Sequence, residues 1–155
     1  MLRAGEEFGV PGDFGVLLLG ISGAGKSDLA LRLIAGGAML VADDRCDLFV
    51  SGGGLCAKAP RTLQGLIEVR GVGIVSLPCA SDAKIGLAVH LVSPDGIVRL
   101  PEPARFRPPE ALAAPESAWP PEIAVAPFEA SAPAKIAAAA AALATKRGER
   151  KPVRS

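Results

Sequence analysis

The sequence predicts an α/β fold in which a phosphate-binding loop (P-loop) joins a central strand to a helix, and further strands complete a mixed sheet with few helices. Three observations predict this fold. An apolar run at residues 16–20 leads into a glycine-rich segment and then a helical pattern, the order of elements that a P-loop requires. The middle of the chain consists almost entirely of short strand-like runs separated by turns. One further helical pattern lies near the C-terminal end, so we do not expect a purely parallel sheet.

Length and composition indicate one domain spanning residues 1–155. Half of the 155 residues are hydrophobic, which is enough for a buried core. The net charge is +1, and five of the Lys and Arg residues lie within residues 143–155. We therefore predict a basic flexible tail at residues 146–155, and a body without the basic excess that nucleic-acid binding requires.

The chain lacks the sequence features of secreted and membrane proteins. No apolar run approaches the roughly 20 residues of a membrane span, and the first residues contain no apolar core of signal-peptide length. Three widely spaced cysteines, Cys46, Cys56 and Cys79, include no CxxC pair, which fits reduced thiols rather than a disulfide framework or a zinc site. We expect a cytoplasmic protein that binds neither nucleic acid nor a membrane.

The first two elements flank the P-loop. The run VLLLG at residues 16–20 is typical of a buried strand at the centre of a sheet. Residues 26–37 are expected to form a helix that ends at Gly36 and Gly37, because glycine readily adopts the conformations that terminate helices. Its expected apolar face consists of Leu29, Ala30, Leu33 and Ile34.

The remaining elements are mostly short strands. Residues 47–59 are predicted to form a β-hairpin around SGGG. Other strands are expected at residues 38–44, 66–69, 73–77, 85–92 and 122–128. The proline-rich segment 101–121 is expected to be an irregular connection. A second helix is predicted at residues 131–148, with Ser131 as its cap and Pro133 near its first turn.

The segment GISGAGKS matches the P-loop pattern GxxxxGK[ST], in which glycines let backbone N–H groups surround a phosphate. The helix that begins there adds the positive end of its dipole. Lys26 is placed to reach the outer phosphates, and the Ser27 hydroxyl to bind Mg²⁺. The residues predicted to bind nucleotide are Gly20, Ile21, Ser22, Gly23, Ala24, Gly25, Lys26 and Ser27.

Asp43 and Asp44 end the strand predicted after the P-loop helix. Neighbouring strand residues point to opposite faces, so one carboxylate can face the phosphates while the other turns away. A carboxylate at this place can hold Mg²⁺ through water or accept a proton from an attacking hydroxyl. The structural alternative is an Asp pair that closes a turn.

Glu68 and Arg70 lie two residues apart in IEVRGVG, so on an extended backbone they share a face. The carboxylate can add to a metal site, and the guanidinium can clamp a phosphoryl group. An ordinary surface ion pair fits these two residues equally well.

In this order and spacing, GVLLLGISGAGKSDLALRLI, MLVADD and LQGLIEVRGVGIV resemble the catalytic domain of HPr kinase/phosphorylase. PFEASAPAKI is similar to the corresponding segment of the short alphaproteobacterial form, which consists of the catalytic domain only. The P-loop is shared by many proteins, so IEVRGVG is the discriminating stretch. The resemblance covers roughly residues 15–140 and implies an HPr kinase/PEP carboxykinase-like fold.

The resemblance also implies an activity. The family uses ATP and Mg²⁺ to phosphorylate a serine of HPr, a small phosphocarrier of the phosphotransferase system, and removes that phosphate with inorganic phosphate, yielding pyrophosphate. Lys26 and Ser27 match the family's phosphate and magnesium residues. The family's proton-accepting aspartate lies in the matched pair, where we favour Asp43 as the base and Asp44 as its support. Glu68 matches a magnesium-binding glutamate.

Other matched positions complete the expected site. Arg70 belongs to the signature beside Glu68, and Arg99 matches a catalytic arginine. Ser131 and Lys135 lie in the segment that resembles the region tied to dephosphorylation. The family usually has a histidine at or near the position of Gly5, and this chain has none there.

Three functions remain open from the sequence: an HPr kinase/phosphorylase, a nucleotide-binding regulatory module with weak or lost catalysis, and a small-molecule kinase on the same fold. The departure near Gly5 motivates the second. The expected partners are an HPr-like phosphocarrier, ATP, inorganic phosphate and pyrophosphate. Family members form hexamers, so the resemblance also implies a homo-oligomer.

Overall fold

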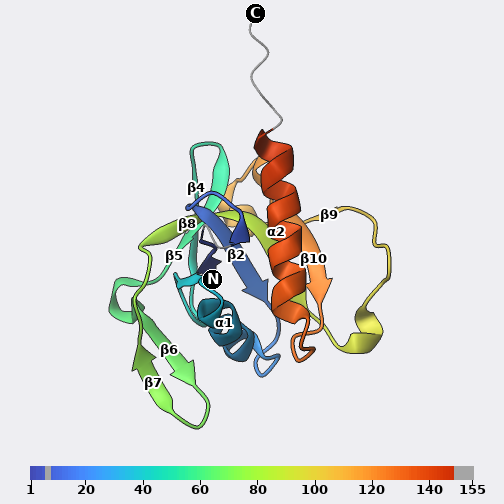
Figure 1. The fold of residues 1–155 in the computed structure, drawn as a ribbon. Helices are drawn as coiled ribbons and strands as arrows, with labels where there is room; N and C mark the ends of the chain where they lie inside the picture. Colours follow the sequence, from blue (N-terminus) through green and yellow to red (C-terminus); the bar gives the residue numbers. More distant parts are fainter. Residues whose placement is uncertain (6–7, 149–155) are drawn as a thin grey trace, which may run out of the picture.

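The computed structural model describes residues 1–5 and 8–148, and in that part of the chain it contains two β-sheets and two α-helices (Figure 1). The strands are β1 (Leu2–Arg3), β2 (Phe14–Leu19), β3 (Met39–Leu40), β4 (Asp47–Ser51), β5 (Gly54–Lys58), β6 (Leu66–Val69), β7 (Gly73–Ser76), β8 (Asp82–Leu91), β9 (Ala104–Arg105) and β10 (Pro121–Val125). The helices are α1 (Lys26–Ala35) and α2 (Ala132–Gly148), with short 3-10 turns η2 (Arg61–Leu63), η3 (Pro94–Gly96), η4 (Glu110–Leu112) and η5 (Glu116–Ala118).

The large sheet has the strand order β3-β1-β2-β8-β10-β9, and the β4–β5 hairpin joins it where β5 pairs with the start of β8. Both β2 and β10 run parallel to β8, whereas the other pairings are antiparallel. The prediction of a mixed sheet with few helices is therefore confirmed. Because β2, β8 and β10 are parallel, their carboxyl ends lie at one edge of the sheet, where ligands bind in open α/β folds.

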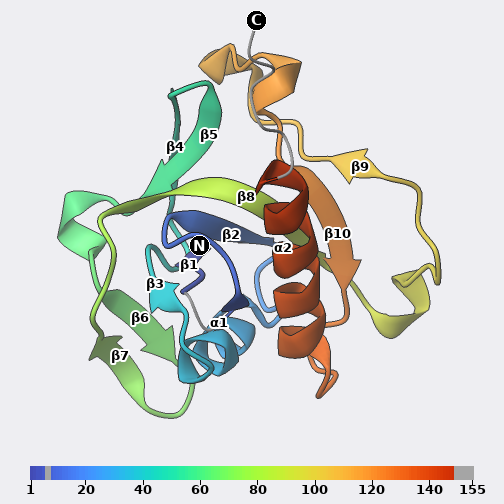
Figure 2. The same cartoon turned by 45° about the horizontal axis from the view of Figure 1, so that its top comes forward.

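The central strand β2 is buried on both faces, which explains why its sequence is continuously apolar. Val16 and Leu18 pack in the core beneath the two helices. Leu17 points to the opposite face and belongs to a second core that includes Leu55 and Ile85. Figures 1 and 2 show α1 and α2 together on one face of the sheet.

The strands β6 and β7 form a separate two-stranded sheet that projects beside α1 (Figure 1). Ile67 anchors this hairpin because it is buried in the core beneath the helices. Val72 and Ile74, by contrast, are exposed towards the outer end of the hairpin.

The strand predicted at residues 38–44 is much shorter in the structure. It pairs with β1, which has only two residues and was not predicted from the sequence. After Leu40 the chain leaves the sheet, although the N–H groups of Val41 and Ala42 still donate to the Met1 carbonyl at 3.1 and 3.2 Å. Asp43 and Asp44 consequently lie in a bend, and the expectation that they occupy a strand end is wrong.

Most other predicted elements are confirmed. The hairpin turns at Gly52 and Gly53, whose φ values of 56° and 73° favour glycine. The helix α2 begins directly after Ser131, whose carbonyl accepts from the Lys135 N–H at 2.9 Å. The last strand ends at Val125 rather than at residue 128, because the chain turns towards α2.

The proline-rich segment and the C-terminal end agree only in part with the prediction. The segment 101–121 is largely irregular as predicted, but it contains β9, η4 and η5 and provides the first residue of β10. Residues 149–155 of the predicted tail lie outside the described residues, and residues 146–148 belong to α2. Within the described part of the chain, no helix is long and apolar enough to cross a membrane.

Candidate active site

The P-loop leaves the carboxyl end of β2 and leads directly into α1. Gly23 and Gly25 have φ values of 80° and 95°, which side chains rarely tolerate. Gly25 is the N-cap residue of α1, and no side chain caps the helix there. The first N–H groups of the helix are therefore available to an anion, as in other phosphate-binding loops.

Lys26 folds back across the loop. Its Nζ donates to the carbonyl oxygen of Gly20 at 2.7 Å and to that of Ile21 at 3.1 Å. These contacts keep the ammonium beside the phosphate-binding backbone. A bound phosphate can replace the two carbonyls as its partner.

Asp43 connects the P-loop with the β6–β7 hairpin. Its Oδ1 accepts a hydrogen bond from the Ser27 hydroxyl at 2.9 Å, and its Oδ2 accepts one from the backbone N–H of Glu68 at 3.0 Å. The sequence predicts Asp43 beside the P-loop, but it does not predict the hydrogen bond with the Glu68 backbone. Every residue except proline has a backbone N–H, so the identity of residue 68 could not predict this contact.

A cavity of about 260 Å³ opens beside these groups. Its polar lining includes Lys26, Asp43 and Asp44, and its apolar lining includes Leu17, Leu19, Leu48 and Phe106. Cys46 also lines it, and burial raises the pKa of this thiol. Both carboxylates and the P-loop lysine therefore surround a space that the hydroxyl of a phosphate acceptor could enter.

The oxygen groups at the P-loop fit Mg²⁺ bound together with a nucleotide. Among the described residues, no three His, Cys, Asp or Glu side chains are arranged as a metal site. Mg²⁺ commonly takes only one or two protein carboxylates together with substrate phosphates, so it needs no such cluster. Ser27 and Asp43 supply oxygens within hydrogen-bond distance of each other.

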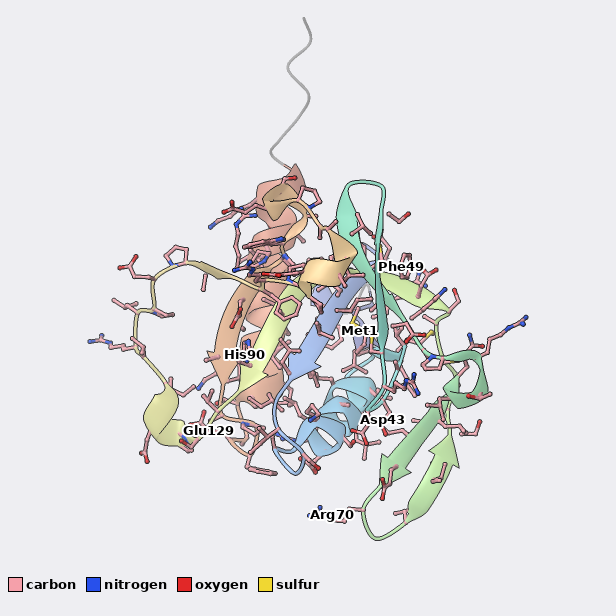
Figure 3. All side chains as sticks on the ribbon, turned by 180° about the vertical axis from the view of Figure 1, so that it is seen from behind. Met1, Asp43, Phe49, Arg70, His90 and Glu129 are labelled. Carbon is pink, nitrogen blue, oxygen red and sulfur yellow. The ribbon has the colours of Figure 1, made fainter. Side chains whose placement is uncertain are left out.

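The side chains of Glu68 and Arg70 are exposed. Figure 3 shows Arg70 at the outer end of the β6–β7 hairpin, apart from Asp43. Within residues 1–5 and 8–148 these two side chains form no ion pair with each other. The structure thus brings the backbone of the IEVRGVG segment to the site, while its charged groups face solvent.

Arg99 and Ser131 lie on the loops that follow β8 and β10, at the same sheet edge as the P-loop. Arg99 is exposed after η3. Lys135 lies in the first turns of α2 and pairs with Glu129 at 2.8 Å. In the described part of the chain, the side chains of Arg99, Ser131 and Lys135 make no hydrogen bond or ion pair with the P-loop.

Sequence reasoning missed a contact between α1 and the turn at residues 126–131. Arg32 donates through Nη1 to the carbonyl of Glu129 at 3.2 Å and through Nη2 to the carbonyl of Pro127. It also forms a salt bridge of 3.0 Å with Asp28, which is the i, i+4 pair that the sequence alone makes readable. The contacts with the turn could not be read, because they depend on where β10 ends.

The same turn places Phe128 against the P-loop. A Cβ atom built on Gly25 would lie 2.8 Å from the Phe128 ring. Gly5, near the position of the family's usual histidine, is enclosed differently, since a Cβ there would lie 3.2 Å from the Gly37 carbonyl. A larger residue at Gly5 would therefore require the turn after α1 to move.

Comparison with known proteins gives consistent matches. Residues 10–95, more than half of the chain, match the family model described as the HPr serine kinase C-terminal domain. The HPr kinase/phosphorylase of Clostridium tetani is 43% identical over 84 residues, which are 50% of this chain and 28% of that protein. The HPr kinase/phosphorylase of Leptothrix cholodnii is 42% identical over 93 residues, covering 55% of this chain and 29% of that protein. The matches thus span less than a third of the length of these relatives.

A solved structure extends the similarity over most of the fold. The Hpr(Ser) kinase/phosphatase from Coxiella burnetii aligns with a TM-score of 0.70 and 25% sequence identity, covering 88% of this chain and 86% of that one. The residues matched by the family model include the P-loop, the Asp pair and the segment 68–73. They do not include Arg99 or the turn at residues 126–131.

Proposed function

The chain belongs to the family of the HPr serine kinase C-terminal domain, and on this premise we propose that it transfers the terminal phosphate of ATP to a serine of an HPr-like phosphocarrier. The observation that carries the proposal is the hydrogen bond of 2.9 Å between Ser27 and Asp43. It places a carboxylate at the P-loop, next to the cavity of about 260 Å³ that Lys26 also lines.

In the proposed reaction, the serine side chain of the phosphocarrier enters this cavity. Its hydroxyl oxygen attacks the γ-phosphorus in line, the bond from that phosphorus to the β–γ bridging oxygen breaks, and ADP leaves. Asp43 accepts the hydroxyl proton, with Asp44 in support. Lys26 and the N–H groups of the loop stabilise the charge of the transferring group.

Mg²⁺ would neutralise phosphate charge, and we propose Ser27 as one of its protein ligands. Glu68, whose side chain faces solvent in this structure, is proposed as the second ligand once its side chain turns towards the P-loop. Arg70 and Arg99 are proposed to reach the phosphoryl group from neighbouring segments. For dephosphorylation, an oxygen of inorganic phosphate would attack the phosphorus of the phosphoserine, the bond from that phosphorus to the serine oxygen would break, and pyrophosphate and the free serine hydroxyl would form. We assign this step to the segment containing Ser131 and Lys135. We place the reaction in the cytoplasm, where ATP is available.

A radiolabelled transfer assay tests the proposal. The purified chain, ATP and Mg²⁺ should label an HPr-like protein on serine, and labelled phosphoserine protein with inorganic phosphate should release pyrophosphate. The double variant Asp43→Asn, Asp44→Asn should lose transfer but largely retain ATP binding. Normal labelling by this variant would show that the assignment of the base is wrong.

A nucleotide-binding regulatory module is the second candidate, because Arg70 is exposed and the chain has no histidine at or near Gly5, where the resemblance implies one. Tight ATP binding without transfer to any HPr-like protein would favour this module. We also propose that the chain forms a homo-oligomer, which the family resemblance makes a hexamer. Light scattering tests this assembly, and a monomer at working concentration would contradict it.

A further inference from the structure

The strand order places two different segments on opposite sides of the P-loop. In the order β3-β1-β2-β8-β10, the P-loop follows β2, Asp43 follows β3, and the turn at residues 126–131 follows β10. Figure 3 shows Asp43 and Glu129 on opposite sides of the start of α1. A nucleotide in the loop would therefore meet one segment at each end.

The reacting end of the nucleotide belongs on the Asp43 side. Ser27 donates to Asp43 there, and the cavity beside Lys26 opens there. The backbone of a P-loop encloses the inner phosphates, its Lys reaches the outer phosphates, and its Ser hydroxyl binds Mg²⁺. If the γ-phosphate lies towards Asp43, the α-phosphate and the nucleoside leave the loop on the side of the 126–131 turn.

Phe128 is the apolar group that this turn offers. Its ring reaches Gly25, with a Cβ built on that glycine only 2.8 Å away, yet 73% of the residue remains exposed. An exposed aromatic ring next to a phosphate-binding loop can stack on a nucleobase, because every base has an apolar face.

Arg32 holds the backbone on both sides of this ring. Its guanidinium donates to the carbonyls of Pro127 and Glu129, the two residues that flank Phe128, and is held by Asp28. Glu129 is held in turn by Lys135 at 2.8 Å. A turn whose backbone is already held loses little freedom when a ligand binds to its side chain, which favours affinity.

We propose that Phe128 contacts the base of the bound nucleotide and that Arg32 is its positioning residue. The inference rests on the ATP binding that the proposed function includes. It assigns the two sides of the loop to the two ends of the nucleotide: the Asp43 side to the γ-phosphate and the acceptor, and the Phe128 side to the base.

The test compares two ligands that share the phosphates and differ in the base. Isothermal titration with Mg²⁺ measures the affinity for ATP and for inorganic tripolyphosphate. Phe128→Ala should weaken ATP binding about tenfold and leave tripolyphosphate binding unchanged, whereas Phe128→Trp should retain ATP affinity. Val50→Ala, an exposed apolar position in the β4–β5 hairpin, is the matched control and should change neither affinity.

A double-mutant cycle tests the role of Arg32. Arg32→Ala should weaken ATP binding less than Phe128→Ala does, and it should add nothing in the Phe128→Ala background, because the ring that it positions is then absent. Equal losses for ATP and tripolyphosphate in Phe128→Ala would overturn the base contact, as would no loss for either. A wild-type chain that binds no ATP would overturn both proposals. Normal ATP binding without transfer, together with the expected losses, would overturn only the proposed kinase activity.

Discussion

The two sides of the P-loop are built from different chemistry. On one side, Asp43 joins Ser27 to the backbone of Glu68 through two hydrogen bonds and borders a cavity. On the other side, the turn at residues 126–131 presents an aromatic ring. Arg32 holds this turn through its backbone carbonyls, and Lys135 holds it through the Glu129 side chain. The first side supplies groups that can move a proton, and the second supplies a surface that can position a ligand.

The P-loop sequence therefore predicts where phosphate binds in such a site. It does not predict which groups lie on either side of the loop. The loop itself can bind phosphate in many unrelated proteins. In our proposal, the segments that follow its neighbouring strands determine which end of the nucleotide reacts. Variants on the two sides should therefore affect different steps.

The largest expected effect comes from Asp43→Asn. If Asp43 is the base, transfer to the phosphocarrier should fall by about 10²–10⁴-fold, because the amide cannot accept the proton. ATP affinity, measured by titration in the absence of the phosphocarrier, should change much less. Asp44→Asn is the matched control and should lose less transfer than Asp43→Asn. An equal or greater loss in Asp44→Asn would reverse the roles of the pair.

A smaller effect is expected from Gly25→Ala, which acts on the Phe128 side. The residue has φ 95°, so alanine is strained there, and its Cβ would lie 2.8 Å from the Phe128 ring. We expect a loss of about 1–2 kcal/mol in the free energy of unfolding, measured by urea denaturation. Adding Phe128→Ala should restore the part of this loss that is due to the ring.

Gly52→Ala is the control for Gly25→Ala. Gly52 also has a positive φ, 56°, but a Cβ there meets nothing within 4 Å. Its loss of stability should therefore not respond to Phe128→Ala. A rescue of both glycine variants by Phe128→Ala would show that the ring does not act through contact with Gly25.

The smallest expected effect concerns Cys46 in the cavity on the Asp43 side. Burial raises the pKa of this thiol above its ordinary 9.0, so the unfolded chain loses the thiol proton at lower pH than the folded chain. The contribution to stability is therefore complete below pH 9.0 and declines as the pH rises above it. The fall in unfolding free energy between pH 8 and pH 10.5, from urea titrations, should be smaller in Cys46→Ala. Cys79→Ala, at an exposed cysteine, is the control and should leave the fall in unfolding free energy unchanged. If Cys46→Ala also leaves this fall unchanged, the cavity does not shield the Cys46 thiol from water.

The sequence predicted the parts of the site whose signals are local. The P-loop is a contiguous motif between a strand and a helix, and the pair of carboxylates follows the next apolar run. A continuous apolar run also located most of β8, and the helix-forming alanines after the Ser131 cap located α2.

The parts that the sequence could not predict depend on distant partners. The length of β3 is set by β1, a two-residue strand with no periodic signal of its own. The hydrogen bonds from Arg32 to the carbonyls of Pro127 and Glu129, which we call the Arg32 clamp, use groups that every residue carries. The identities of these two residues therefore could not predict the contact. The bond between Asp43 and the Glu68 backbone is hidden for the same reason.

The Arg32 clamp also has a consequence for synthesis of the chain. The hydrogen bond from Ser27 to Asp43 spans 16 positions, whereas that from Arg32 to Glu129 spans 97. At roughly 5–20 residues per second, about 5–20 seconds separate the translation of Arg32 from that of Glu129. A nascent chain thus contains the P-loop and Asp43 well before the turn at residues 126–131 has been synthesised. The proposed nucleotide binding would then favour the finished chain over its unfinished intermediates, since a ligand stabilises only the state that binds it.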